Sequence, residues 1–125
     1  MPDRKKKKIL IVDDSFAMRL VLRGCFPSNT YEFCEAETAS EALAQFEKER
    51  PDLMLLDIVM SEGDAAGVEA LEQVMKAHPD ARVVMISAIG QESTIRQCRK
   101  LGAKDYIIKP FDQQIVCQVV EKFTA

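Results

Sequence analysis

The chain has 125 residues, of which 47% are hydrophobic and 30% are charged, and its formal net charge is −3. This length and balance are typical of one globular domain and exclude a disordered polypeptide. The negative charge argues against general attraction to nucleic acid, and no apolar run approaches the roughly 20 residues of a membrane helix.

The N-terminus is charged and leads straight into an apolar run, without the apolar region of a secretory signal. We therefore expect a cytoplasmic protein. Residues 1–7 are interpreted as a basic lead-in that keeps an exposed strand end soluble, rather than as a nucleic-acid-binding segment. The cysteines lack metal-ligand spacing and are interpreted as small buried hydrophobes in a reducing compartment. They are Cys25, Cys34, Cys98 and Cys117.

Two pairs of a strand and a helix are predicted in the first half of the chain. Ile9–Val12 is a short apolar strand, and the helical pattern that follows it ends at Pro27. The predicted buried face of this helix consists of Met18, Val21, Leu22 and Cys25. Tyr31–Ala36 is the second strand. Thr38 and Glu41 have the spacing of a capping box, which predicts the start of the second helix.

Three further pairs follow. Leu53–Leu56 is a fully apolar strand, and a loop rich in glycine and alanine, Ser61–Gly67, separates it from the third helix. Val83–Ile86 and Tyr106–Ile108 are the last two strands, and the helix between them ends at Gly102. The predicted inward-facing residues of the last three helices are Val68, Leu71, Met75, Ile95, Cys98, Leu101, Val116, Val119, Val120 and Phe123.

Five strands that alternate with five helices predict repeated βαβ units and hence a parallel sheet. The strands are apolar throughout rather than alternating, which indicates that both faces of the sheet are covered. We therefore predict an α/β fold with a doubly wound five-stranded parallel sheet.

Polar residues follow four of the predicted strands. Asp13 and Asp14 follow the first strand, Asp57 the third, Ser87 the fourth and Lys109 the fifth. Each has a plain alternative role as a helix cap, a turn residue or a surface lysine. Ligands of such sheets bind outside the carboxyl ends of the strands, however, and four compatible strand ends favour one shared site.

The charges indicate what this site binds. Three carboxylates against one ammonium leave two net negative charges, which are costly to hold in a partly desolvated pocket. Mg²⁺ neutralises them and prefers oxygen ligands in an open acidic cleft. With this ion present, Lys109 and the Ser87 hydroxyl could hold the oxygens of a phosphoryl group. The residues therefore predict phosphoryl chemistry on a carboxylate.

Four motifs resemble the receiver domains of two-component response regulators, over essentially the whole chain. The motifs are Ile9–Ser15, Leu55–Met60, Ile86–Ala88 and Gly102–Phe111. The resemblance, which extends to single-domain receivers of chemotaxis, implies a single receiver domain over residues 1–125 and a flavodoxin-like sheet with strand order 2-1-3-4-5. It also implies a signalling protein whose only reactions are its own phosphotransfer and autodephosphorylation.

The resemblance further implies a role for each charged site residue. Asp57 would accept a phosphoryl group from a phosphohistidine on a sensor histidine kinase or phosphotransfer protein. Asp14, Asp57 and the backbone carbonyl of Val59 would ligate Mg²⁺, and Asp13 would act mainly through water. Lys109 would pair with the phosphoryl oxygens.

The remaining roles concern the switch. Ser87 would be the hydroxyl that moves toward the phosphate, and Tyr106 would follow it inward, although a half-buried tyrosine with its hydroxyl in water is the alternative. Ala88 would leave room for access, and the peptide bond before Pro110 would be cis. The face made by the fourth helix, fifth strand and fifth helix would then bind a downstream protein. The receiver would be a monomer or a phosphorylation-dependent dimer, and it would contact neither nucleic acid nor membrane directly.

The loop after the acceptor departs from the family pattern. Ser61 stands where the family usually has proline, and Gly63–Gly67 replaces a shorter turn. Because this loop borders the metal site, we expect altered kinetics rather than loss of function.

Several alternatives are open. An excised receiver of a DNA-binding regulator would have the same sequence. A Mg²⁺-dependent aspartyl phosphohydrolase would carry a D-x-D motif after the first strand, where this chain has Asp13, Asp14 and Ser15. A flavin-binding electron carrier would need a phosphate-binding loop after the first strand, where Asp13 and Asp14 would repel a phosphate. A receiver-like module used only for protein interaction would not need Asp13, Asp14 and Asp57. His78 is interpreted as an exposed loop residue at the wrong end of the sheet for a phosphodonor.

Overall fold

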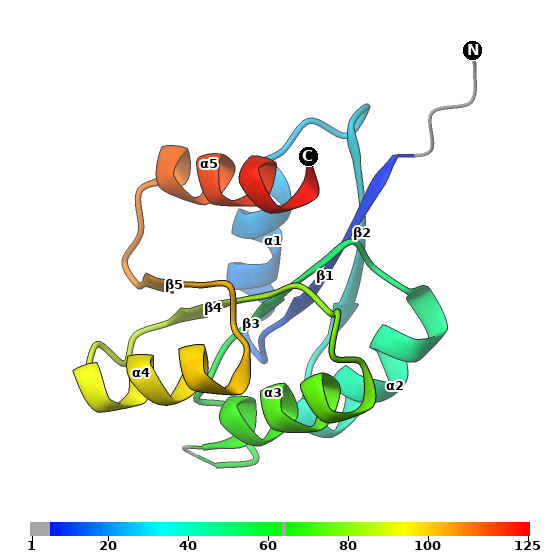
Figure 1. The fold of residues 1–125 in the computed structure, drawn as a ribbon. Coiled ribbons are helices and arrows are strands. Elements are labelled where there is room, and N and C mark those ends of the chain that lie inside the picture. The colour runs from blue at the N-terminus through cyan, green and yellow to red at the C-terminus, as the bar shows by residue number, and fades with distance from the viewer. Residues whose placement is uncertain (1–5, 64) are drawn as a thin grey trace.

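The computed structural model describes residues 6–63 and 65–125, in which five strands alternate with five helices (Figure 1). Most of the predicted basic lead-in, residues 1–5, lies outside the described residues, as does Asp64 of the long loop. The strands are β1 (Lys7–Val12), β2 (Tyr31–Ala36), β3 (Leu53–Leu56), β4 (Val83–Ser87) and β5 (Asp105–Ile108). The helices are α1 (Phe16–Gly24), α2 (Ala39–Glu49), α3 (Ala66–Ala77), α4 (Glu92–Leu101) and α5 (Gln113–Thr124).

All strand pairs are parallel, and the order in the sheet is β2-β1-β3-β4-β5. The chain order therefore reverses between β1 and β3, whose ends are in register at Val12 and Leu56. Helices α1 and α5 cover one face of the sheet, and α2, α3 and α4 cover the other (Figure 1). The predicted doubly wound α/β fold is confirmed.

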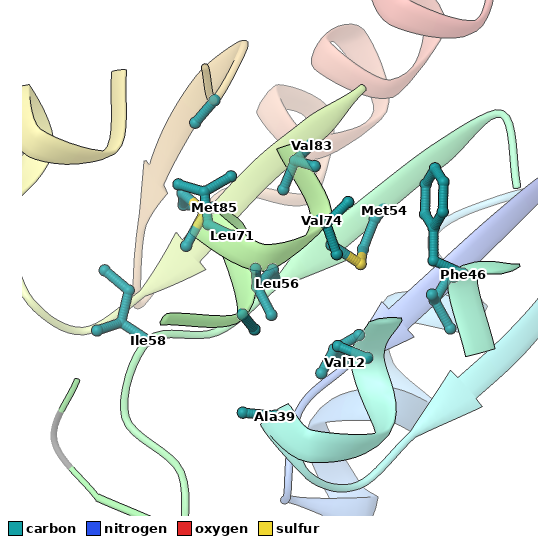
Figure 2. Close-up of a cluster of buried hydrophobic side chains, with 14 of the residues drawn as sticks. Val12, Ala39, Phe46, Met54, Leu56, Ile58, Leu71, Val74, Val83 and Met85 are labelled. Carbon is teal, nitrogen blue, oxygen red and sulfur yellow. The ribbon is translucent and has the colours of Figure 1, made fainter. Parts of the chain in front are cut away.

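Successive strand residues supply the cores on the two faces of the sheet. Leu10, Val12, Met54 and Leu56 belong to the core beneath α2, α3 and α4, whereas their neighbours Ile9, Ile11, Leu53 and Leu55 belong to the core beneath α1 and α5. Figure 2 shows the first of these cores, where Leu71 and Val74 of α3 lie against the sheet. Burial on both faces explains why the strands read as continuous apolar runs.

Side-chain caps form at the starts of α1 and α2, and the second is the predicted capping pair of Thr38 and Glu41. The Ser15 hydroxyl accepts from the N–H of Met18 at 3.1 Å, and the Thr38 hydroxyl accepts from the N–H of Glu41 at 3.2 Å. The Thr38 hydroxyl in turn donates to the Glu41 carboxylate at 3.0 Å. The two hydroxyls thus accept from backbone donors in the first turns of their helices, where such donors lack the usual helical partner.

Three expectations about helix α1 and the long loop were wrong. Helix α1 ends at Gly24 rather than at Pro27, and α3 begins at Ala66, inside the predicted loop. Val21 belongs to the predicted buried face but is 43% exposed. The buried position beside Leu22 is taken instead by Arg19, because acceptors on neighbouring segments satisfy its guanidinium.

The cysteines agree only partly with their interpretation. All four are free thiols, but Cys98 alone is fully buried, and the other three are partly exposed. None of the helices in the described part of the chain has the length and apolar character needed to cross a bilayer.

Gly67 allows α3 to approach the segment that follows β3. A Cβ atom at this position would lie 1.9 Å from the carbonyl oxygen of Asp57 and 2.5 Å from the Cα of Ile58. The Gly67 N–H also donates to the Ile58 carbonyl at 2.8 Å. The close contact therefore fixes the start of α3 against the backbone that carries Asp57.

We expect Gly67→Ala to lower the free energy of unfolding by about 1–3 kcal/mol, because backbone atoms must move to admit the methyl group. Urea denaturation measures the change. Gly24→Ala is the matched control, since nothing lies within 4 Å of its added Cβ, and it should leave the stability unchanged or slightly raised. Equal midpoints for the two variants would contradict the close approach.

Candidate functional site

The polar strand ends meet at the carboxyl edge of the sheet. Carboxylate oxygens of Asp13, Asp14 and Asp57 all lie within 4.8 Å of one another. The Lys109 ammonium, which arrives from the end of β5, donates to Asp13 at 2.9 Å and to Asp57 at 3.1 Å. The predicted convergence is therefore present for the three carboxylates and Lys109. It arises because β1 and β3 are neighbours in the sheet and the long Lys109 side chain reaches across from β5.

Backbone donors orient the two buried carboxylates. The N–H of Ser15 donates to Asp13 Oδ1 at 2.9 Å, and the N–H of Ile58 donates to Asp57 Oδ1 at 2.7 Å. The Oδ2 atom of each faces Lys109, whereas the Asp14 side chain is exposed. The cluster is thus hydrogen-bonded on its inner side and open to solvent at Asp14.

The electrostatics of the site are unbalanced. Burial raises the pKa of the Asp57 carboxyl above its ordinary value, the negative charge of Asp13 adds to this effect, and Lys109 only partly opposes it. Burial lowers the pKa of the Lys109 ammonium, but the two carboxylates outweigh this effect and raise it. The lysine therefore stays charged, and the cluster retains an excess of negative charge that favours a cation.

The Ser87 hydroxyl is buried at the end of β4 and accepts from the N–H of Ile89 at 3.2 Å. The Tyr106 ring is buried on the adjacent strand, and its hydroxyl donates to the carbonyl of the same Ile89. The alternative in which the tyrosine hydroxyl lies in water was therefore wrong. Both side chains therefore bond to the backbone of the same residue, Ile89, in the segment between β4 and α4.

The other predicted site residues follow the ends of β3, β4 and β5. Val59 follows Asp57 by two positions, and its side chain is exposed, as is Ala88 after β4. The Lys109–Pro110 peptide bond is cis, as predicted.

Arg19 is a site residue that the sequence pattern did not reveal. Its side chain is only 6% exposed, and its guanidinium donates to the Asp13 carbonyl at 2.6 Å and to the Glu35 carboxylate at 2.7 Å. Glu37 lies 3.7 Å away. Helical arginines are normally exposed, so the only available signal was the pair of glutamates at the end of the second strand. Through the Asp13 carbonyl, Arg19 fixes the backbone that carries both Asp13 and Asp14.

His78 does not match its interpretation as an exposed residue, since its side chain is only 16% exposed. Its Nε2 lies 3.0 Å from the Glu47 carboxylate, its Nδ1 lies 3.3 Å from the Arg50 guanidinium, and its ring lies 5.1 Å from that of Phe46. The histidine joins the end of α3 to the end of α2. It precedes β4 and is therefore at the opposite edge of the sheet from Asp57.

Comparison with known proteins agrees with this geometry. The family model of the response regulator receiver domain matches residues 9–121. The chemotaxis protein CheY of Listeria monocytogenes is 41% identical over 92% of this chain and 96% of its own length. Sporulation initiation phosphotransferase F of Bacillus subtilis is 35% identical over 94% of this chain and 93% of its own. The crystal structure of the CheX–CheY–BeF3–Mg²⁺ complex from Borrelia burgdorferi superimposes with a TM-score of 0.87 at 34% identity, covering 95% of this chain and 90% of the other.

The chain belongs to the response regulator receiver domain family. It has the role of a phosphoacceptor in two-component signalling and is a signalling protein rather than an enzyme. Its homologues include CheY proteins, which are single-domain chemotaxis regulators.

The raised pKa of Asp57 has a consequence for stability. In metal-free protein the native state binds this proton more tightly than the unfolded chain does. The contribution of Asp57 is therefore most favourable below its unfolded pKa of about 4 and falls as the pH rises through the native pKa. Because Asp57→Asn cannot ionise, we expect it to gain stability relative to the wild type as the pH rises from about 3 to 7.

Urea denaturation in EDTA at several pH values measures this difference. Asp80→Asn, at an exposed carboxylate, controls for the substitution itself. If the wild type instead became more stable relative to Asp57→Asn as the pH rises, the electrostatic account would be contradicted.

Proposed function

We propose that Asp57 accepts a phosphoryl group from a phosphohistidine on a sensor histidine kinase or phosphotransfer protein, in a reaction that requires Mg²⁺. The observation that carries the proposal is the position of Lys109. Its ammonium bonds to both Asp13 and Asp57 within a cluster of three carboxylates. Such a set supplies an acceptor oxygen, ligands for a divalent cation and a fixed positive charge for the incoming group.

The donor atoms fit Mg²⁺. All three side chains offer carboxylate oxygens, and the exposed Asp14 leaves room for the water ligands that this ion retains. Asp14, Asp57 and the Val59 carbonyl would ligate the ion directly, and Asp13 would act through water. The ion would neutralise charge on the transferred group. The similar CheX–CheY complex contains Mg²⁺, which supports this assignment.

In the transfer, an Asp57 carboxylate oxygen forms a bond to phosphorus while the bond from phosphorus to the imidazole nitrogen of the donor breaks. The electron pair of the broken bond stays on the imidazole. Lys109, already 3.1 Å from Asp57 Oδ2, would then pair with a phosphoryl oxygen. Hydrolysis of the acyl phosphate by water would later return the free carboxylate, so that autodephosphorylation completes the cycle.

The switch would act through Ile89. Phosphorylation would add negative charge and acceptor oxygens after the end of β3, next to the strand that ends in Ser87, whose hydroxyl is buried. When this hydroxyl turns toward the phosphoryl group, it leaves the N–H of Ile89, whose carbonyl accepts from Tyr106. The change would reach the face of α4, β5 and α5, where Ile108 and Ile115 are exposed apolar side chains that a downstream protein could cover. Ala88 would leave access to the site.

The donor would dock on α1. Phe16, Leu20 and Val21 are 68%, 58% and 43% exposed, and α1 begins two residues after Asp14. An apolar patch on the helix that follows Asp13 and Asp14 is suited to a phosphohistidine protein, which must approach Asp57 from the same end of the sheet. A cytoplasmic location is part of the proposal, and it is supported by the four free thiols, which suit a reducing compartment.

We expect the wild type, incubated with Mg²⁺ and acetyl phosphate, to gain a phosphate-sized adduct that is stable in acid and labile in base. Intact mass measurement detects it. Asp57→Ala should gain no adduct, and EDTA should abolish labelling of the wild type because the metal neutralises the reacting charges. Labelling of Asp57→Ala to the wild-type extent would exclude Asp57 as the acceptor.

We expect Leu20→Asp to slow phosphotransfer from a phosphorylated histidine kinase about tenfold or more, because a charge enters the apolar patch. Its labelling by acetyl phosphate should be unchanged, since the small donor needs no docking surface. Ile115→Asp is the matched control, because it introduces the same charge at an exposed isoleucine on a different helix, α5. If Leu20→Asp and Ile115→Asp accept the phosphoryl group from the kinase at the same rate, α1 is not the docking surface.

A further inference from the structure

The loop after Asp57 contains a tight turn with Glu62 near its tip. Met60 and Gly63 face each other across the turn: the Gly63 N–H donates to the Met60 carbonyl at 2.9 Å, and the Met60 N–H donates to the Gly63 carbonyl at 3.3 Å. The Met60 side chain is buried in the core beneath α3. The turn therefore projects from a fixed base.

The Glu62 carboxylate reaches across to the start of α2. It accepts from the N–H of Ala39 and from the N–H of Ser40, the latter at 3.3 Å from each carboxylate oxygen. These are the first two backbone donors of the helix, and the Thr38 hydroxyl takes the next one, from Glu41. A carboxylate from a segment more than twenty residues away thus completes the N-terminal cap of α2.

The contact is suited to an ionised side chain. The Ser40 hydroxyl and the two backbone donors lower the pKa of the Glu62 carboxyl below its ordinary value. The side chain is exposed, so the attraction acts in high dielectric and is moderate in strength. Its importance lies in what it holds rather than in its contribution to overall stability.

The contact restrains the segment nearest the proposed metal site. Val59 lies between Ile58, whose carbonyl is held by Gly67 at 2.8 Å, and the buried Met60. Ser61 follows and imposes no backbone restriction of its own, unlike a proline at that position. The Glu62 contact therefore supplies the outer restraint on the backbone that leads away from Val59.

We propose that Glu62 is a positioning residue that holds the loop after Asp57 against α2 and thereby strengthens Mg²⁺ binding through the Val59 carbonyl. The inference rests on the proposed function of Asp57. Helix α2 contributes no side chain to the cluster of three carboxylates. Through Glu62 it would nevertheless affect the affinity of the cluster for Mg²⁺.

The test compares Glu62→Ala with Glu72→Ala, which removes an exposed glutamate from the middle of α3. Mg²⁺ affinity is measured by isothermal titration calorimetry, well below the unfolding transition of each variant as followed by circular dichroism. We expect Glu62→Ala to bind Mg²⁺ about tenfold more weakly than the wild type, as for other residues that orient metal ligands. Glu72→Ala should bind as the wild type does.

Two further readouts separate positioning from general destabilisation. Labelling by acetyl phosphate should need more Mg²⁺ in Glu62→Ala, but its rate at saturating Mg²⁺ should approach that of the wild type. Glu62→Gln, which retains acceptor oxygen but loses the charge, should have an intermediate affinity. A lower unfolding midpoint for Glu62→Ala with an unchanged Mg²⁺ affinity would overturn the inference.

The same experiment distinguishes this inference from the proposed function. If the wild type takes up phosphate on Asp57 and Glu62→Ala has the wild-type Mg²⁺ dependence, the positioning role fails and the receiver function stands. If the wild type itself takes up no phosphate, the assignment of Asp57 fails, and the inference fails with it.

Discussion

The excess of negative charge at the carboxyl edge of the sheet is the constraint on which the site depends. Asp13 and Asp57 are buried side by side, and one ammonium, from Lys109, neutralises only part of their charge and that of Asp14. Isolated buried carboxylates would be costly, so the fold supplies a backbone donor to each and leaves Asp14 exposed for a cation. The arrangement is tolerable without metal and poised to bind one. This property makes phosphoryl transfer to a carboxylate physically reasonable.

Around this cluster, polar contacts tie the segments that follow β1 and β4 to neighbouring elements. Arg19 of α1 connects the Asp13 backbone to Glu35 of β2, and Ser87 and Tyr106 connect β4 and β5 through Ile89. These contacts are few and buried or half-buried, so losing any one of them has local consequences. Ile89 is thus the residue at which the ends of β4 and β5 are joined by side-chain hydrogen bonds.

The long loop after Asp57 is held in place at two points. Ser61 replaces the usual proline and gives the backbone more freedom, but Glu62 attaches the turn to the start of α2. Gly67 secures the other end of the loop by its close approach to Asp57 and Ile58. The loop is thus held by two contacts of different kinds, one electrostatic at Glu62 and one steric at Gly67.

The sequence by itself determined the elements, the fold class and the residues at the strand ends. Apolar periodicity and βαβ connectivity are properties of local sequence, and parallel strands necessarily bring Asp13, Asp57 and Lys109 to one edge. The tertiary structure alone decided the burial of Arg19, the exposure of Val21 and the contact of Glu62 with α2. Each of these features depends on segments that are distant in the sequence and meet only in the folded chain. A guanidinium is buried only where acceptors surround it, and a carboxylate caps the helix of another segment only where its own loop lies next to the start of that helix.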